Sequence, residues 1–77
     1  MKIEILGTGC PKCKKLYENA QAAVKESGRG DVEVVKIEDI NEITARGVMM
    51  TPALSVDGQI KSVGKVIGPG DIKKHIK

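Results

Sequence analysis

The sequence predicts a single α/β domain, residues 1–77, in which four strands form a mixed sheet flanked by helices. Three observations indicate this fold. Two segments rich in β-branched residues enclose a long stretch with helical spacing, an Asp-Gly pair separates two further extended segments, and 77 residues suffice for one core. The expected order is β-α-β-α-β-β-α. Because a helix joins the first two strands, we expect them to be parallel with a right-handed crossover.

The first half of the chain shows strand, helix and strand patterns in turn. Residues 2–6 read KIEIL and alternate, which predicts a strand. From Pro11 onward the apolar residues recur at spacings of three and four, which predicts a helix ending near Gly28. Residues 32–37 read VEVVKI, with four β-branched side chains in six, and predict the second strand.

Two short helices are expected in the second half. Residues 39–46 begin with Asp39, and Glu42 follows three positions later, which resembles a capping box with Asp in the Ser/Thr role. The final GPGDIKKHIK opens with Gly and Pro and then places Ile72 and Ile76 four positions apart. This spacing predicts a short helix at the end of the chain.

A hairpin is expected between these two helices. Asp57 and Gly58 separate the extended segments 53–56 and 59–63. Asp-Gly is a strong signal for a two-residue turn, so the two segments should pair as antiparallel strands.

Composition and charge exclude several classes of protein. The net charge of +3 comes from lysines scattered over the whole chain, and Tyr17 is the only aromatic residue. Single-stranded nucleic acids bind to aromatic stacking platforms, so we expect no nucleic-acid partner. No signal peptide is recognisable, and no apolar run approaches the ~20 residues that a membrane span needs. We therefore expect a cytoplasmic monomer without a membrane partner.

The two cysteines form a CxxC pair, Cys10 and Cys13, at the start of the first helix. They are too close in sequence to connect distant parts of the fold. If the helix begins at Pro11, Cys10 is its N-cap and Cys13 lies in its first turn. Residues three apart on a helix are ~5–6 Å apart, within the range that a disulfide tolerates. The pair could therefore hold a metal or exchange electrons.

The surroundings expected for the two sulfurs differ. Cys10 lies at the positive end of the helix dipole, next to N–H groups without partners, and both features favour a thiolate. Lys12 adds positive charge nearby and could tune the redox potential of the pair. Cys13 falls on the apolar stripe with Leu16 and should be more buried. We therefore expect Cys10 to attack a substrate and Cys13 to resolve the product.

The element order, together with GCPKC at 9–13 and MTPAL at 50–54, resembles the thioredoxin superfamily. Its small thioredoxin-like or glutaredoxin-like redox-active disulfide proteins, found in archaea and bacteria, are the most similar. The resemblance implies thiol–disulfide exchange by a Cys10–Cys13 disulfide. It also implies a cis Pro52, and a Thr51 main chain that pairs with the substrate. The substrates would be disulfides of cytosolic proteins, and no further cofactor motif is present. The electron donor would be a reductase or a small thiol.

Two weaker parallels concern a carboxylate and a glycine-rich turn. Thioredoxins carry a buried acid six residues before the first cysteine, which here gives Glu4; an ordinary edge glutamate is the alternative. If Glu4 lies beside Cys13, it could take the proton of the resolving thiol. Gly68, Gly70 and Asp71 resemble the turn with which glutaredoxins hold glutathione. Their alternative role is a plain turn with a helix cap.

The main alternative is a small metal carrier, because two thiolates in a CxxC suit a soft ion such as Cu(I). Those carriers follow the order βαββαβ, whereas this chain has helical spacing at 39–46 and at its end. A structural zinc site lacks two ligands, which the distant His75 does not supply. A binding module without turnover is the other alternative. We therefore expect no metal site and a thiol–disulfide oxidoreductase.

Overall fold

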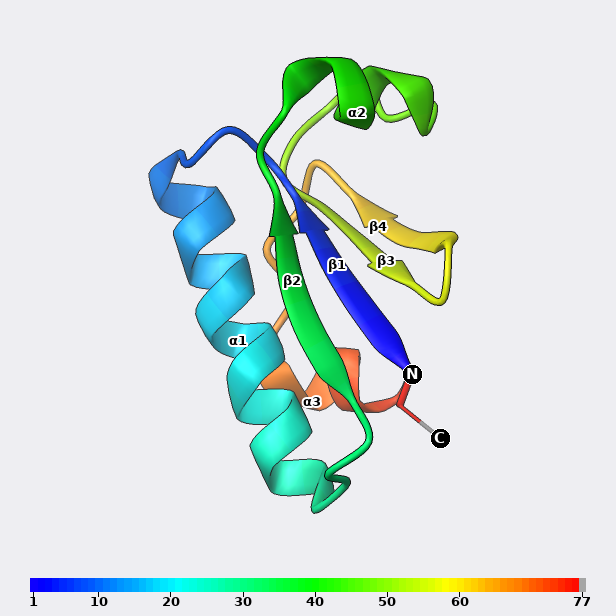
Figure 1. Cartoon of the computed structure of the whole chain (residues 1–77). Coiled ribbons are helices and arrows are strands. Elements are labelled where there is room, and N and C mark those ends of the chain that lie inside the picture. The colour runs from blue at the N-terminus through cyan, green and yellow to red at the C-terminus, as the bar shows by residue number, and fades with distance from the viewer. Residues whose placement is uncertain (77) are drawn as a thin grey trace.

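The computed structural model describes residues 1–76. At its centre lies a mixed four-stranded sheet, with helices on both faces (Figure 1). The strands lie in the order β2-β1-β3-β4. The elements are β1 (Lys2–Leu6), α1 (Pro11–Ser27), β2 (Glu33–Ile37), α2 (Ile40–Ala45), β3 (Ala53–Val56), β4 (Gln59–Val63) and α3 (Pro69–Lys73). This arrangement confirms the α/β fold and the order βαβαββα. Within the described part of the chain, no helix has the length and apolar character needed to cross a membrane.

Strand β1 is central and pairs on both sides. It runs parallel to β2, with Ile5 opposite Lys36, and antiparallel to β3, with Ile5 opposite Leu54. The parallel pair has α1 as its crossover, as the sequence predicts. Strands β3 and β4 are antiparallel, and a register shift lies between Leu54 and Ser55.

The β3–β4 hairpin turns at Asp57 and Gly58. Their φ angles are 51° and 84°, so both residues occupy the left-handed region that a two-residue turn of this kind requires. The side chain of Asp57 also accepts a hydrogen bond of 2.8 Å from the N–H of Lys2. This bond ties the turn to the start of β1.

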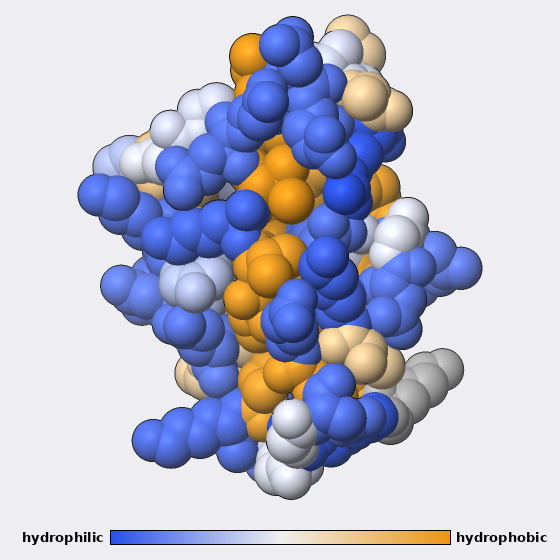
Figure 2. All heavy atoms as spheres, in the orientation of Figure 1, coloured by the Kyte–Doolittle hydropathy of each residue, from blue (hydrophilic) through white to orange (hydrophobic). Residues whose placement is uncertain are grey.

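Helix α1 covers one face of the sheet together with α3 (Figure 1). Its buried residues are Cys13, Leu16, Ala20 and Ala23, and Gly28, with a φ of 71°, is its C-cap. Figure 2 shows a band of hydrophobic surface between α1 and β2, flanked by hydrophilic side chains. Partly buried valines border the larger core here: Val24 of α1, Val34 of β2 and Val32, which precedes β2.

Helix α2 belongs to a smaller core on the opposite face. Its buried Ile43 packs with Leu6, Val48 and Ala53. The helix begins at an Asp39 cap, whose side chain accepts the N–H of Asn41 at 2.9 Å. The sequence predicted a capping box in which Glu42 completes the cap, but the Glu42 carboxylate accepts from Arg46 at 3.3 Å.

Three elements have boundaries that differ from those expected. Strand β2 begins at Glu33 and not at residue 32, α2 spans Ile40–Ala45 and not 39–46, and α3 ends at Lys73. Beyond α3 the chain turns more tightly than an α-helix. The N–H groups of His75 and Ile76 donate hydrogen bonds to carbonyls three residues earlier, as in a 3₁₀ turn. Ile76 is nevertheless buried in the larger core, so burial explains its apolar character without a longer helix.

Candidate functional site

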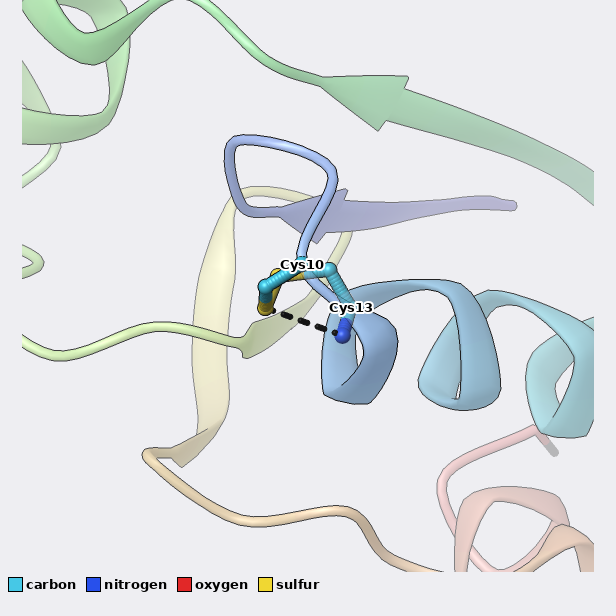
Figure 3. The surroundings of a disulfide bond; sticks show 2 residues. All are labelled: Cys10 and Cys13. Atoms are coloured by element: carbon cyan, nitrogen blue, oxygen red, sulfur yellow. Dashed lines mark hydrogen bonds between the residues drawn. A yellow bond between two sulfur atoms is a disulfide. The ribbon is translucent and has the colours of Figure 1, made fainter.

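The cysteine pair, Cys10 and Cys13, lies where the loop after β1 enters α1 (Figure 3). Cys10 and Cys13 form a disulfide, and their Cα atoms are 5.1 Å apart. Cys10 is the N-cap of α1, as predicted, and its sulfur accepts the N–H of Cys13 at 3.2 Å. The Cys10 carbonyl also accepts the N–H of Lys14 at 3.0 Å. The sulfur of Cys10 therefore satisfies one of the free donors of the helix terminus.

The two sulfurs differ in access to solvent. Cys10 is half-buried and is followed by the exposed Pro11 and Lys12, whereas only 5% of Cys13 is exposed. A reaction partner from solution can therefore reach Cys10 more readily. Lys12 lies at this exposed edge, where its charge is screened by solvent.

Gly7 lies next to the side chain of Cys13. A Cβ atom at Gly7 would overlap the Cys13 sulfur and would lie 3.0 Å from the Cys13 Cβ. The same position is 3.9 Å from the Cα of Pro52. The backbone at Gly7 therefore lies next to both Cys13 and Pro52. Gly7 is not among the site residues expected from the sequence.

The loop before β3 that contains Thr51 and Pro52, here called the proline loop, also lies next to Gly7. The Thr51–Pro52 peptide bond is cis, Pro52 is buried and Thr51 is exposed. The Pro52 carbonyl accepts the N–H of Gly64 at 2.8 Å, which anchors the loop. The structure thus brings together the CxxC pair and the two residues that the resemblance implied. Two exposed methionines precede them: Met49 and Met50.

A small pocket of about 70 Å³ opens beside Cys13. It is lined by Ile5, Gly7, Gly9, Cys13, Lys14, Lys36 and Glu38. The Lys36 ammonium lies 4.4 Å from the centre of the Tyr17 ring, one helical turn beyond Cys13. The charged side chains that line this pocket, Lys14, Lys36 and Glu38, therefore come from α1, from β2 and from the residue after β2.

Glu4 lies on the other face of β1. It is buried, and its carboxylate accepts a hydrogen bond from Arg46, which follows α2. That bond is the main reason why the pKa of Arg46 is raised, with the charge of Glu42 adding to it. Cys13 lies on the Ile5 and Gly7 side of the strand, so the structure does not bring Glu4 to Cys13.

The glycine-rich turn also lies away from the disulfide. Gly68 is the N-cap of α3 without a side-chain bond, and Asp71 forms an exposed pair with Lys74 at 3.6 Å. The turn is fixed by Asn19, which donates to the Ile67 carbonyl at 3.0 Å. Asn19 is six residues, or about 9 Å, further along α1 than Cys13. The structure therefore does not bring Gly70 and its neighbours to the redox pair.

Metal ligands do not gather around the cysteines. Across residues 1–76, no group of three or more His, Cys, Asp or Glu side chains is placed to hold a metal ion. The chain also lacks the hairpin directly after the first helix that small metal carriers have, since α2 intervenes.

Comparison with known proteins agrees with this geometry. The family model described as "Thioredoxin domain" matches residues 1–77. A thioredoxin of Methanothermobacter thermautotrophicus is 46% identical over 74 residues, which cover 96% of this chain and 95% of that protein. A thioredoxin of Methanocaldococcus jannaschii is 47% identical over 75 residues, covering 97% of this chain and 85% of that protein.

The fold, the capped CxxC disulfide and these relatives lead to one activity. The protein is a thiol–disulfide oxidoreductase whose reacting groups lie in the CxxC pair. The resemblance suggested by GCPKC and MTPAL is confirmed over the whole chain. By sequence match, fold and redox pair, the chain belongs to the thioredoxin family.

Proposed function

We propose that the protein reduces disulfides of cytoplasmic proteins, with Cys10 as the nucleophile and Cys13 as the resolving cysteine. The supporting observation is the difference between the two sulfurs. The Cys10 sulfur caps α1 and accepts an N–H, whereas Cys13 is 5% exposed and rests on Gly7. Hydrogen bonding and the helix dipole favour a thiolate at Cys10, which is the reactive form.

The reaction follows from thiol–disulfide exchange. The Cys10 thiolate attacks one sulfur of the substrate, forms a mixed disulfide and releases the other sulfur as a thiolate. Cys13 loses its proton to solvent, attacks the Cys10 sulfur and releases the second substrate thiol. The substrate gains two electrons, and the protein loses them and is left oxidised as the Cys10–Cys13 disulfide. A separate donor must then reduce that disulfide.

The surface around the proline loop fits a polypeptide substrate. Thr51 is exposed beside the redox pair, and the preceding Met49 and Met50 are 95% and 63% exposed. Flexible apolar methionines suit substrates of varied shape. The main chain of Thr51 would hold the substrate against Pro52.

The donor in this proposal is a reductase, because the glycine-rich turn suited to a small thiol lies away from the disulfide. The cysteine pair is itself the redox centre, and the proposal needs no additional cofactor or metal. The protein acts as a monomer.

Two serine variants test the order of attack. Reduction of insulin by dithiothreitol should lose its acceleration in Cys10→Ser. Cys13→Ser should instead accumulate a mixed disulfide, visible by mass spectrometry. Limiting iodoacetamide should label Cys10 first in the reduced protein. Labelling of Cys13 first, or a mixed disulfide formed by Cys10→Ser, would contradict the assignment.

A further inference from the structure

We propose that Gly7 is a positioning residue, which leaves space for the sulfur of Cys13 and keeps it aligned for attack on Cys10. The proposal rests on the order of attack given above and adds a residue outside the CxxC and proline motifs. Gly7 itself takes no part in bond making.

Space, and not backbone freedom, is what Gly7 provides. Gly9 in the same loop has a φ of 90°, a conformation that favours glycine whatever surrounds it. Gly7 has no positive φ, so a larger residue could adopt its backbone conformation. A Cβ at Gly7 would nevertheless overlap the Cys13 sulfur and would lie 3.0 Å from the Cys13 Cβ. The sulfur of Cys13 therefore occupies the volume that a side chain would need.

The backbone at Gly7 is fixed on both sides. Its N–H donates to the Ile37 carbonyl at 2.9 Å, which continues the β1–β2 ladder by one residue. On the other side, the Cα of Pro52 lies 3.9 Å from the position of a Cβ. A methyl group at Gly7 would therefore find no free volume on the side of Cys13. The sulfur of Cys13 would have to move.

Cys13 can yield only by turning its side chain or by a movement of the first turn of α1. The helix is anchored by Leu16, which is fully buried three residues later. A new methyl group would therefore turn the Cys13 side chain or lift the first turn of α1. Displacements near 1 Å at a reacting atom can cost about a hundredfold in rate. The attack by Cys10 uses the more exposed sulfur, whereas the atoms nearest to a Cβ at Gly7 belong to Cys13 and Pro52.

The proposal predicts that the two steps of the reaction respond differently to Gly7→Ala. Dithiobis(nitrobenzoate) reports both, because Cys10 releases the first coloured thiolate and Cys13 releases the second. In stopped-flow measurements on the reduced protein, we expect the first phase to stay within about twofold. The second phase should slow by between about tenfold and a hundredfold.

Gly30→Ala is the matched control. A Cβ there meets nothing within 4 Å, and its φ is not positive, so neither phase should change. Equal slowing of both phases by Gly7→Ala, or an unchanged second phase, would overturn the proposal. Failure of the proposed order of attack has a different signature, namely a first phase that survives in Cys10→Ser and is lost in Cys13→Ser.

A stability measurement keeps the proposal testable if Gly7→Ala folds poorly. Removing the sulfur in Cys13→Ala removes the overlap. Under reducing conditions, Gly7→Ala should therefore lower the thermal midpoint less than half as much in the Cys13→Ala background as in the parent. An equal loss in both backgrounds, or failure to fold in both, would show that Gly7 is needed for another reason and would overturn the proposal.

Discussion

The two faces of β1 perform different tasks, although their residues alternate along one strand. Ile3, Ile5 and Gly7 face α1, where the larger core and Cys13 lie. Glu4 and Leu6 face the opposite side, where Glu4 pairs with Arg46 and Leu6 joins the smaller core. One face thus carries the redox chemistry and the other carries a buried ion pair. A carboxylate close to the CxxC in sequence is separated from it by the thickness of the sheet.

The difference between the faces lies in how each is anchored. The α1 face rests on a helix of 17 residues that also packs against α3. The α2 face rests on a helix of six residues with one buried side chain, Ile43. We therefore expect the α1 face to dominate both the stability of the fold and the placement of the disulfide, and the α2 face to have little effect on the chemistry.

The largest expected effect comes from emptying the core of the α1 face. Leu16→Ala should lower the free energy of unfolding by about 3–4 kcal/mol, through lost burial and the cavity left behind. Ile43→Ala on the other face should cost about 2 kcal/mol, because a short helix with solvent around it can settle into the gap. Urea denaturation of both reduced variants measures the difference. An equal or greater loss for Ile43→Ala would reverse the comparison.

A smaller effect is expected from breaking the buried ion pair. Arg46→Met leaves the Glu4 carboxylate buried without its partner and should lower the free energy of unfolding by about 2 kcal/mol. This loss is smaller than for a fully enclosed pair, because the Arg46 side chain is 29% exposed. Glu4→Gln keeps one hydrogen-bonding group and should cost about 1 kcal/mol.

The same variants test whether the α2 face affects the redox reaction on the α1 face. Both phases of thiolate release should keep their rates in Glu4→Gln across pH 6–9. Arg29→Met is the matched control for Arg46→Met, because its pair is exposed, and it should leave stability nearly unchanged. A second phase that slows in Glu4→Gln would place this carboxylate in the redox reaction after all.

Most of the fold could be predicted because its signals are local. The spacing after Pro11, the Asp57-Gly58 turn and the Cys10 cap each depend on neighbours within a few residues. The end of the short α3 was harder to predict. Ile76 is apolar because it is buried in the larger core, although it lies beyond the helix. Its spacing from Ile72 therefore resembled one more helical turn.

The site shows the same limit. The CxxC pair is visible in the sequence, since its spacing is the signal. The partner of Glu4 is Arg46, 42 positions away, and only the packing of α2 decides that pairing. The contact of Gly7 with Cys13 likewise depends on how closely α1 approaches the end of β1. Gly7 follows β1 without a positive φ, so its role comes from the space that it leaves for Cys13. Neither the φ angle nor that space can be read from the sequence.

The smallest expected effect concerns the exposed ion pair between α1 and β2, which lies outside both cores. Arg29 donates two hydrogen bonds to Asp31, of 3.1 and 2.7 Å. These bonds are the main reason why the pKa of Asp31 is lowered, and the nearby charges add to the effect. The folded-state pKa is the lower one. The pair therefore stabilises the fold above the unfolded value of about 3.9, and this contribution is lost as the pH falls through the folded value.

An NMR titration of the Asp31 carboxyl carbon measures this shift directly. The midpoint should lie below the ordinary value, return to it in Arg29→Gln and move towards it in concentrated salt, since exposed charges are screened. Arg46→Met is the matched control and should leave the Asp31 midpoint in place, because its charge pairs with Glu4 and Glu42 on the α2 face. A midpoint that follows Arg46 rather than Arg29 would mean that the ion pairs are coupled through the molecule. The separation between the redox face, the ion-pair face and the exposed turn would then fail.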